Sequence, residues 1–578
     1  MRTQLQSQAN YGFSVRPPSW DIDSLYGRVL QRVQQSLPLR IEKINMYVPS
    51  EKNRSKINLS DEQIDASINT GKPTMIVGPA GCGKSVVLTQ RIKNIVEQKE
   101  KEYDSNIKIL LTTFNRDIIK HLGDWLEQIL DETRCRRTYD SYKGKISDHS
   151  YFTFNGSPTP NIYILNFDKL PTKFGGFGWL NMTINYQEIE AFHLDTMQKI
   201  SNEYFDRSGL NKKEHSKILD PNFLIDEYHR IIYGQLCTNE KTYQTKERKG
   251  SGNNPTLRYK TPRRQIVWKI IYNYLSWLKN NNLGNFTMQR QRLLRKLRNS
   301  GAPILFNHIL VDEIQDCTLA DYEIFLKMLS DKNNLIIAGD LAQSIHLGSS
   351  VHLPIAEFEK KKLKGSFRLP FRISEAIKPL SLMINAKFRK KKADGETEII
   401  NPYKGSPPGA RPIIVYAKDH NYLAIKIKEI FNSYKIFGLD TISVFERDYE
   451  LSGALSSLGV GVSPEIILKS KGLEKSCVLW SSRIVVDTKT EIDEFVYTIL
   501  TRTTSILIVA ICENLNPNYA EIIKSFDESR LILWDEESTE EFNKIKRGVL
   551  NLEEDDIDNS GDLTEQQIDS ESSIEEFF

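Results

Sequence analysis

The feature that most constrains this chain is a glycine-rich segment, Gly78–Ser85 (GPAGCGKS), that matches the pattern GxxxxGK[ST] in full. The apolar residues Thr74–Val77 before it predict a buried strand, and the spacing of apolar residues after it predicts a helix. In this context glycines let backbone N–H groups cradle phosphates at a helix N-terminus. We therefore predict an α/β P-loop fold that binds ATP through Gly78, Gly81, Cys82, Gly83, Lys84 and Ser85, with Lys84 at the β- and γ-phosphates and Ser85 on Mg²⁺.

A second constraint is an acidic pair at the end of another apolar run, His308–Glu313 (HILVDE). A P-loop needs a carboxylate on a neighbouring strand to hold the metal, and Asp312 fits that role. Glu313 would then position and deprotonate the attacking water. Acidic pairs at strand ends are common, so this interpretation depends on the complete P-loop upstream.

Residues 312–316 read DEIQD, which resembles motif II (DExQD) of the UvrD/Rep-type DNA helicases of superfamily 1 (1A). Other segments resemble further motifs in family order: Leu59–Ala66 the Q motif, Leu110–Arg116 motif Ia, Ile162–Asp168 motif Ib, Leu335–Ile345 motif III, Gly365–Arg368 motif IV, Ser470–Glu474 motif V and Val496–Thr503 motif VI. Each match outside the P-loop is modest alone, but their number and order make the resemblance specific.

The resemblance implies a role for each matched side chain. Gln63 would read adenine, Gln343 would sense the γ-phosphate, and two arginines would clamp that phosphate from a second domain. The implied catalytic residues are Lys84, Glu313, Gln343, Arg368 and Arg502, the metal ligands are Ser85 and Asp312, and Gln63 and Glu474 add to the nucleotide contacts. The implied DNA contacts are Phe114, Asn115, Arg116, Asn166 and His346.

The resemblance also implies two RecA-like domains, each a parallel sheet flanked by helices, with ATP between them. We expect an N-terminal extension (1–55), a first RecA-like domain 1A (56–125 and 300–350), a mainly helical 1B-like insertion (126–299), a second RecA-like domain 2A (351–550) and an acidic disordered tail (551–578). Only about a hundred residues separate motifs IV and V, so we expect the regulatory 2B insertion to be minimal or absent.

Two departures from the family pattern bear on how the chain grips DNA. His346 stands where the family usually has an aromatic residue followed by Trp-Arg-Gly, and base–aromatic stacking contributes about 1–3 kcal/mol per base. Ile466 and Leu468 replace a threonine and a histidine before motif V. Movement along a strand is therefore a safer prediction than processive unwinding.

The net charge of +3 conceals an asymmetry. Residues 551–578 hold eleven Asp or Glu and no Lys or Arg, so the remainder of the chain carries +14. A basic body suits a nucleic-acid binder, although a cationic surface kept for solubility would look the same. A candidate phosphate-contacting face, or alternatively a solvated basic face, is formed by Arg258, Lys260, Arg263, Arg264, Arg290, Arg292, Arg295, Lys296 and Arg298.

The remaining features concern partners and compartment. The acidic tail, which ends in Ile574–Phe578 (IEEFF), is either a solubilising segment or a peptide that docks on a protein partner such as a nuclease, or on the chain's own basic groove. The six scattered cysteines form no CxxC pair, and neither a secretory signal nor an apolar run of about 18 residues occurs. We therefore expect a cytoplasmic protein without a membrane partner.

We conclude that the sequence predicts an ATP-dependent translocase or helicase moving 3′→5′ on single-stranded or partly duplex DNA, in bacterial-type DNA repair or antiphage defence. The alternative is a nucleotide-dependent DNA-binding switch that regulates a partner nuclease without processive unwinding. RNA as the track is a third possibility, and DExQD argues mildly against it.

Overall fold

The computed structural model describes residues 59–101, 107–130, 135–142, 145–175, 189–209, 215–246, 257–299, 305–343, 357–390, 398–435, 441–446, 449–465, 473–482, 492–512, 515 and 517–548. The expected N-terminal extension, the acidic tail and His346 lie outside the described residues, as do Ile466 and Leu468.

An eight-stranded sheet forms the first lobe, with strand order β3-β4-β5-β2-β6-β7-β1-β8. Its strands are β1 (Thr74–Val77), β2 (Ile109–Thr113), β3 (Cys135–Tyr142), β4 (Lys145–Phe154), β5 (Ile162–Asn166), β6 (His308–Asp312), β7 (Leu335–Gly339) and β8 (Glu359–Lys362). All pairs are parallel except β3–β4 and β4–β5. The strands from β1 to β7 that lie in the parallel part are buried along their length, as the apolar runs predicted.

Helices cover this sheet, and one of them follows the glycine-rich loop as the sequence predicts. They are α3 (Asp61–Ser67), α4 (Lys84–Lys101), α5 (Arg116–Ile129), α6 (Leu170–Phe174) and α12 (Leu319–Met328). Ser60 caps α3 in a reciprocal pair of hydrogen bonds with Gln63, and Thr318 caps α12 in the same way with Asp321.

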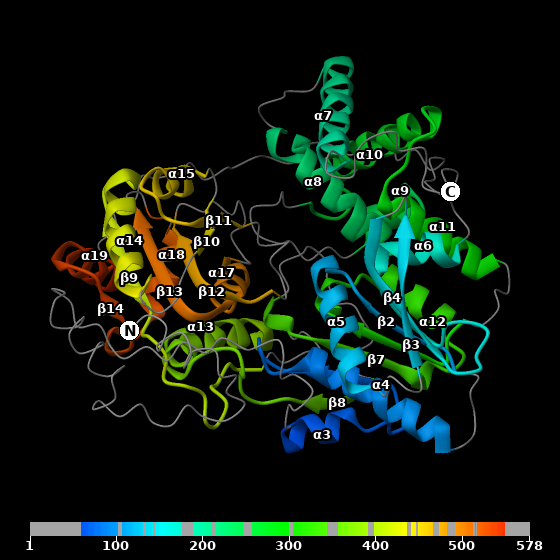
Figure 1. The fold of residues 1–578 in the computed structure, drawn as a ribbon. Helices are drawn as coiled ribbons and strands as arrows, with labels where there is room; N and C mark the ends of the chain where they lie inside the picture. Colours follow the sequence, from blue (N-terminus) through cyan, green and yellow to red (C-terminus); the bar gives the residue numbers. More distant parts are fainter. Residues whose placement is uncertain are drawn as a thin grey trace.

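A six-stranded parallel sheet forms the second lobe, with order β11-β10-β12-β13-β9-β14. Its elements are α13 (Phe371–Lys390), β9 (Ile413–Ala417), α14 (His420–Lys435), β10 (Ile442–Phe445), α15 (Glu450–Ser457), β11 (Val462–Pro464), β12 (Lys475–Ser481), α17 (Ile492–Leu500), β13 (Thr503–Cys512), α18 (Pro517–Ser525), β14 (Ile532–Leu533) and α19 (Glu536–Arg547). Figure 1 shows this lobe, in yellow to red, beside the first lobe. The predicted α/β architecture with two helix-flanked sheets is therefore confirmed.

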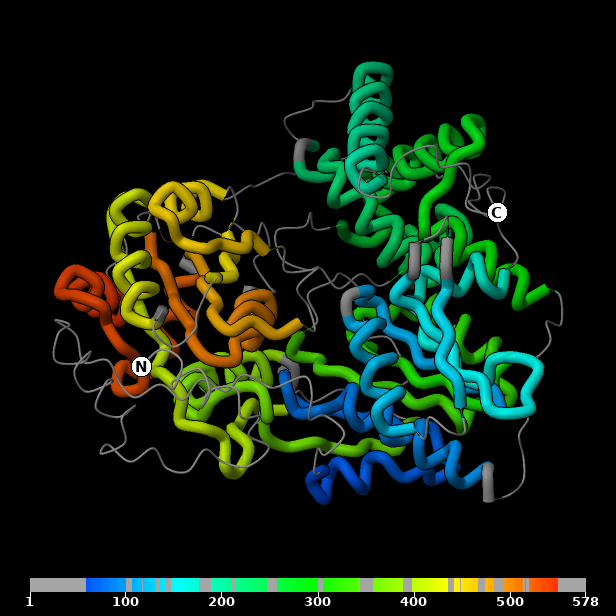
Figure 2. Tube along the Cα trace, in the orientation of Figure 1, coloured from blue at the N-terminus to red at the C-terminus, as the bar shows by residue number. Residues whose placement is uncertain are grey.

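A helical region follows β5 and has an apolar core of its own, built around Trp268 and Tyr274. It contains α7 (Ile189–Ser208), α8 (Pro221–Asp226), a π-helical segment (Glu227–Tyr233), α9 (Glu240–Thr245), α10 (Pro262–Asn280) and α11 (Phe286–Asn299). Figure 2 shows it above the first lobe. Among the described residues, no helix combines the length and apolar character that a bilayer crossing requires.

The sheets extend beyond the boundaries that we expected. Strands β3 to β5 belong to the first sheet although residues 126–166 were assigned to the helical insertion, and β8 belongs to it although it lies beyond residue 350. The edge strand β3 escaped notice because its sequence, CRRTYDSY, offers few apolar residues. The helical region consequently begins only after β5.

The two lobes meet at the glycine-rich loop. Ala80 of that loop and Ala342 pack in the same apolar cluster as Ile373 and Tyr497 of the second lobe. The Phe367 N–H also donates to the Gly81 carbonyl, at 2.9 Å. Residues of the second lobe therefore reach the predicted phosphate site directly.

Candidate nucleotide and DNA site

The glycine-rich loop joins β1 to α4 in a conformation that requires glycine. Gly81 and Gly83 have φ values of +73° and +87°. A Cβ on Gly83 would lie 2.4 Å from Gln63 Nε2, and one on Gly81 would lie 2.4 Å from the Cβ of Arg368. The loop thus takes left-handed turns in a crowded place, which only glycine allows.

Lys84 opens α4, and its ammonium group folds back over the loop. Its Nζ donates to the carbonyls of Gly78 and Pro79, at 2.9 and 3.1 Å. Burial alone lowers the pKa of Lys84, but Cys82 and the carboxylates of Asp340, Glu313 and Asp312 raise it more, so the net shift is upward. The lysine therefore stays charged beside the cradle, as binding phosphate requires.

Ser85 and Asp312 lie together although they are far apart in sequence. The Ser85 hydroxyl donates to Asp312 Oδ2 at 2.6 Å. Burial and the neighbouring Glu313 raise the pKa of Asp312 to about 6. The described residues contain no group of three His, Cys, Asp or Glu side chains placed to hold a metal. A hydroxyl and one carboxylate still fit Mg²⁺, which takes one or two protein ligands and fills its shell with water and phosphate oxygens.

Glu313 adopts a left-handed backbone conformation with φ = 56°. Its own N–H donates to Asp312 Oδ1 at 3.0 Å, and its side chain accepts a hydrogen bond from Gln315 Nε2. Gln315 Oε1 in turn accepts the Asp340 N–H at 3.2 Å. The glutamine of DEIQD therefore ties the acid pair to the strand end of β7, a role that the sequence analysis missed, although the motif itself contains that residue.

Asp340, at the end of β7, is a further buried carboxylate of the site. Burial raises its pKa to about 6, against the opposing effect of Lys84. Its Oδ1 accepts the Ala342 N–H at 3.0 Å, while Oδ2 is buried without a hydrogen-bond partner among the described residues.

Arg502 reaches the first lobe from the second. Its Nη2 donates to Gln343 Oε1 at 3.0 Å, and its Nε donates to the Thr498 carbonyl at 3.0 Å. Burial, followed by the repulsion of Arg368, lowers the pKa of Arg502 to about 9. Its Nη1 is buried and lacks a partner within the described part of the chain. An orphaned guanidinium nitrogen beside a phosphate cradle fits an anionic ligand.

Arg368 is held differently. Its Nε donates to Glu474 Oε1 at 3.0 Å, and its Nη1 donates to the Thr501 carbonyl at 3.3 Å. Both partners follow it in the chain, and its Cβ lies against Gly81. The structure thus places Arg368 at the loop, and it pairs Arg368 with Glu474, the residue expected to contact nucleotide.

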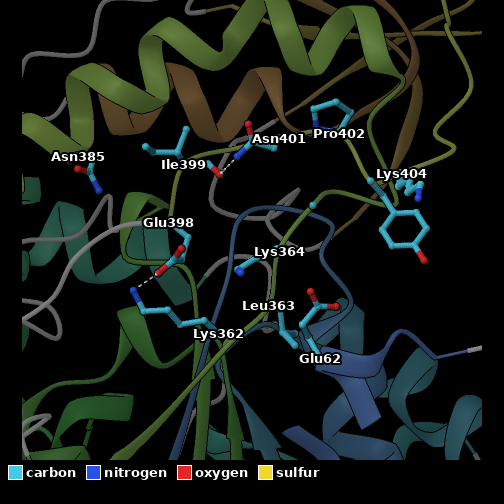
Figure 3. A pocket seen from close by; sticks show the side chains of 12 residues that line it. Glu62, Lys362, Leu363, Lys364, Asn385, Glu398, Ile399, Asn401, Pro402 and Lys404 are labelled. Atoms are coloured by element: carbon cyan, nitrogen blue, oxygen red, sulfur yellow. Dashed lines mark hydrogen bonds and ion pairs between the residues drawn. The ribbon is translucent and has the colours of Figure 1, made fainter. Parts of the chain in front are cut away.

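A cavity of about 570 Å³ is lined by Glu62 of α3 and by residues of β8 and of the segments that follow β8 (Figure 3). Gln63 Nε2 donates to the Cys82 carbonyl at 3.0 Å, and Glu62, the residue before Gln63, lines the cavity. Its wall includes Tyr403, whose ring stacks on Phe367 with centroids 4.0 Å apart. Lys362 pairs with Glu398 across it, at 2.8 Å. This space has the apolar and polar lining that a base and sugar need.

The predicted DNA contacts gather where β2 and β5 end. Phe114 is partly buried and lies on Phe167, with ring centroids 4.7 Å apart. Asn166 Nδ2 donates to the carbonyls of Thr113 and Phe114, at 3.2 and 3.0 Å. Because Asn166 is buried and its amide is used in this way, it shapes the Phe114 turn instead of facing solvent. Asn115 and Arg116 follow on the same turn, at the start of α5.

The structure corrects part of the predicted basic face. Arg264 is buried, and its guanidinium donates to four carbonyls of the helical region. Arg290 is buried as well and pairs with carboxylates. Counting charges along the sequence missed this, because an arginine can serve a buried network as readily as a phosphate.

Comparisons with known proteins agree with this geometry. The family described as UvrD/REP helicase N-terminal domain matches residues 59–347. A "Probable DNA helicase II homolog" of Mycoplasma capricolum subsp. capricolum is 22% identical over 417 residues, covering 68% of this chain and 50% of that protein. One of Mycoplasma genitalium with the same description is 26% identical over 306 residues, covering 50% and 36%. The chain thus spans half or less of the length of these curated relatives.

Proposed function

We propose, from the premise that the chain belongs to the UvrD/Rep helicase family, that it is an ATP hydrolase that moves along single-stranded DNA. The observation that carries this proposal is the bond between Arg502 of the second lobe and Gln343 of the first. A site completed by two lobes makes hydrolysis depend on their closure, and closure is a movement that DNA bound to both lobes can follow.

Within the site, the first lobe performs the binding and the deprotonation. The loop N–H groups and Lys84 hold the phosphates, while Glu313 orients the attacking water and accepts its proton. Ser85 and Asp312 would hold Mg²⁺, which neutralises charge on the phosphate oxygens when bound. We assign Gln63 and the neighbouring cavity to binding the adenine of ATP.

The second lobe stabilises charge on the transferred phosphoryl group. Arg368 lies against the loop at Gly81, and Arg502, bonded to Gln343, offers a nitrogen without a partner among the described residues. In related phosphoryl-transfer sites, an arginine finger raises kcat by a factor of roughly 10³–10⁵. ATP is then cleaved efficiently only when the lobes are closed.

We assign the first sheet to domain 1A, the helical region to 1B and the second sheet to 2A. The Phe114 turn is the assigned DNA contact of 1A. Movement 3′→5′ and a place in DNA repair or antiphage defence follow from the family resemblance. A cytoplasmic location follows from the six scattered cysteines, none of which forms a CxxC pair. Docking of a protein partner on the acidic tail, 551–578, rests on its composition alone.

The test is steady-state ATPase activity with no nucleic acid, single-stranded DNA, duplex DNA and RNA, alongside Lys84→Ala and Glu313→Gln. Strong stimulation by single-stranded DNA that both substitutions abolish is the expected result. Turnover that rises with the length of the DNA strand distinguishes a motor from a switch that only controls a partner. An ATPase rate that no nucleic acid changes would contradict the proposal.

A further inference from the structure

Arg290 belongs to the helical region, yet its guanidinium is buried against the first lobe. Its Nε and Nη2 donate to Asp168 Oδ1, at 3.0 and 2.7 Å. Its Nη1 lies 3.5 Å from Asp321 Oδ1. One cation thereby joins the segment after β5 to the first turn of α12, two parts of the first lobe that are distant in sequence.

On one side, this cation touches the aromatic pair at the assigned DNA contact. The guanidinium carbon of Arg290 lies 4.7 Å from the ring centroid of Phe167 and 5.6 Å from that of Phe114. Arginine over an aromatic face is an attractive and direction-dependent contact. A base that stacks on Phe114 would therefore act on a ring already in contact with Arg290.

On the other side, the same cation holds the segment that follows the catalytic acids. Asp321 Oδ2 caps α12 by accepting the N–H and hydroxyl of Thr318, at 3.1 and 2.7 Å. Asp321 Oδ1 also accepts the Tyr233 hydroxyl, at 2.8 Å. Arg290 thus fixes a carboxylate on which the start of α12 depends.

Two further bonds attach this segment to the helical region. Arg230 Nη1 donates to the Asp316 carbonyl at 2.6 Å, and the Ala320 N–H donates to the Gly234 carbonyl at 3.1 Å. The Asp316 N–H donates to the Glu313 carbonyl at 3.0 Å. A shift of the helical region would consequently reach Glu313 through a single tight turn.

We propose that Arg290 is a positioning residue that couples DNA bound at Phe114 to the placement of Glu313. The inference deepens the proposed function and rests on it. Arg290 acts through Asp168 and the aromatic pair on one side and through Asp321 on the other. Its burial excludes the phosphate-contacting role suggested by its place in a basic stretch of sequence.

The burial of this network decides which substitution is informative. Removing the cation would leave the buried Asp321 carboxylate and the partly buried Asp168 carboxylate without this partner. Leaving a buried charge unpaired strongly destabilises a folded protein. Lysine keeps the charge but loses the planar fork that bonds several partners at once. Arg290→Lys is therefore the test, and Arg207→Lys, at an exposed position on α7 of the same helical region, is the matched control.

The experiment measures ATPase rates of the full chain with and without saturating single-stranded DNA, and DNA affinity by fluorescence anisotropy. For Arg290→Lys we expect the basal rate to stay within about twofold and the DNA-stimulated rate to fall about tenfold, a typical size for coupling between two sites. Arg207→Lys should change neither rate. DNA affinity should change less than the stimulated rate does.

Two outcomes overturn the inference: full stimulation in Arg290→Lys, or an equal loss of basal and stimulated rates, which marks a merely structural role. Should that variant fold poorly, Asp168→Asn keeps the shape of the partner and must show the same selective loss of stimulation. An unstimulated wild type would overturn the proposed function itself. A stimulated wild type with a fully stimulated Arg290→Lys would remove only this inference.

Discussion

The two lobes contribute to the nucleotide site in different ways. In the first lobe, Lys84, Asp312 and Glu313 are placed by bonds within that lobe. They follow or end β1 and β6, the two strands that flank β7 in the sheet. In the second lobe, Arg502 is held partly by Gln343, which belongs to the other lobe. The first lobe therefore positions by itself the groups that bind the phosphates and deprotonate the attacking water. The position of Arg502 depends in addition on how the two lobes meet.

The largest expected effect follows from removing the second lobe's contribution. Arg502→Ala should lower kcat for ATP by roughly 10³–10⁵ while leaving ATP affinity within about tenfold, because the loop and Lys84 bind the phosphates. Single-turnover hydrolysis and binding of a fluorescent ATP analogue measure the two quantities. A parallel loss of binding would contradict the division between the lobes. Arg530→Ala, a partly exposed arginine of the same lobe, is the control.

The next effect tests the first lobe alone. Glu313→Gln preserves size and hydrogen bonding but cannot accept a proton, so we expect hydrolysis to fall by about 10²–10⁴ with ATP binding retained. Glu323→Gln, on α12 of the same lobe, should hydrolyse ATP normally. Comparable hydrolysis by the two variants would show that Glu313 is not the base.

A smaller effect should come from the contact that joins the lobes. Gln343→Ala removes the partner of Arg502 but no charge, and a hydrogen bond to a charged group contributes about 1.5–3 kcal/mol. We expect kcat to fall about tenfold or more. Combining it with Arg502→Lys in a double-mutant cycle measures the coupling. Additive losses would mean that the two residues act independently.

The smallest effect concerns Cys82, the cysteine within the glycine-rich loop. Burial raises the pKa of its thiol, which therefore stays protonated and unreactive at neutral pH. Cys82→Ala should change kcat by less than about threefold, and iodoacetamide at pH 7.5 should leave ATPase activity intact. Rapid inactivation of the wild type, absent in Cys82→Ala, would contradict this.

Sequence patterns predicted those parts of the site that are contiguous. Strand β1, the glycine-rich loop and the start of α4 follow one another, as do β6 and its two acids, so local spacing was enough. The role of Gln315 was out of reach because it depends on Asp340, which β7 brings alongside. Arg290 was misassigned because its partners come from the segment after β5 and from α12, and only packing reveals them.

The order of strands in the first sheet has a consequence for biosynthesis. Strand β1 lies between β7 and β8, and it ends at Val77 whereas β8 ends at Lys362. A ribosome that adds roughly 5–20 residues per second needs roughly 15–60 s to cover that interval. Until β7 is made, near the end of this interval, the apolar strand that precedes the glycine-rich loop has neither neighbour, so the nascent chain must keep it from aggregating until most of the protein has been made.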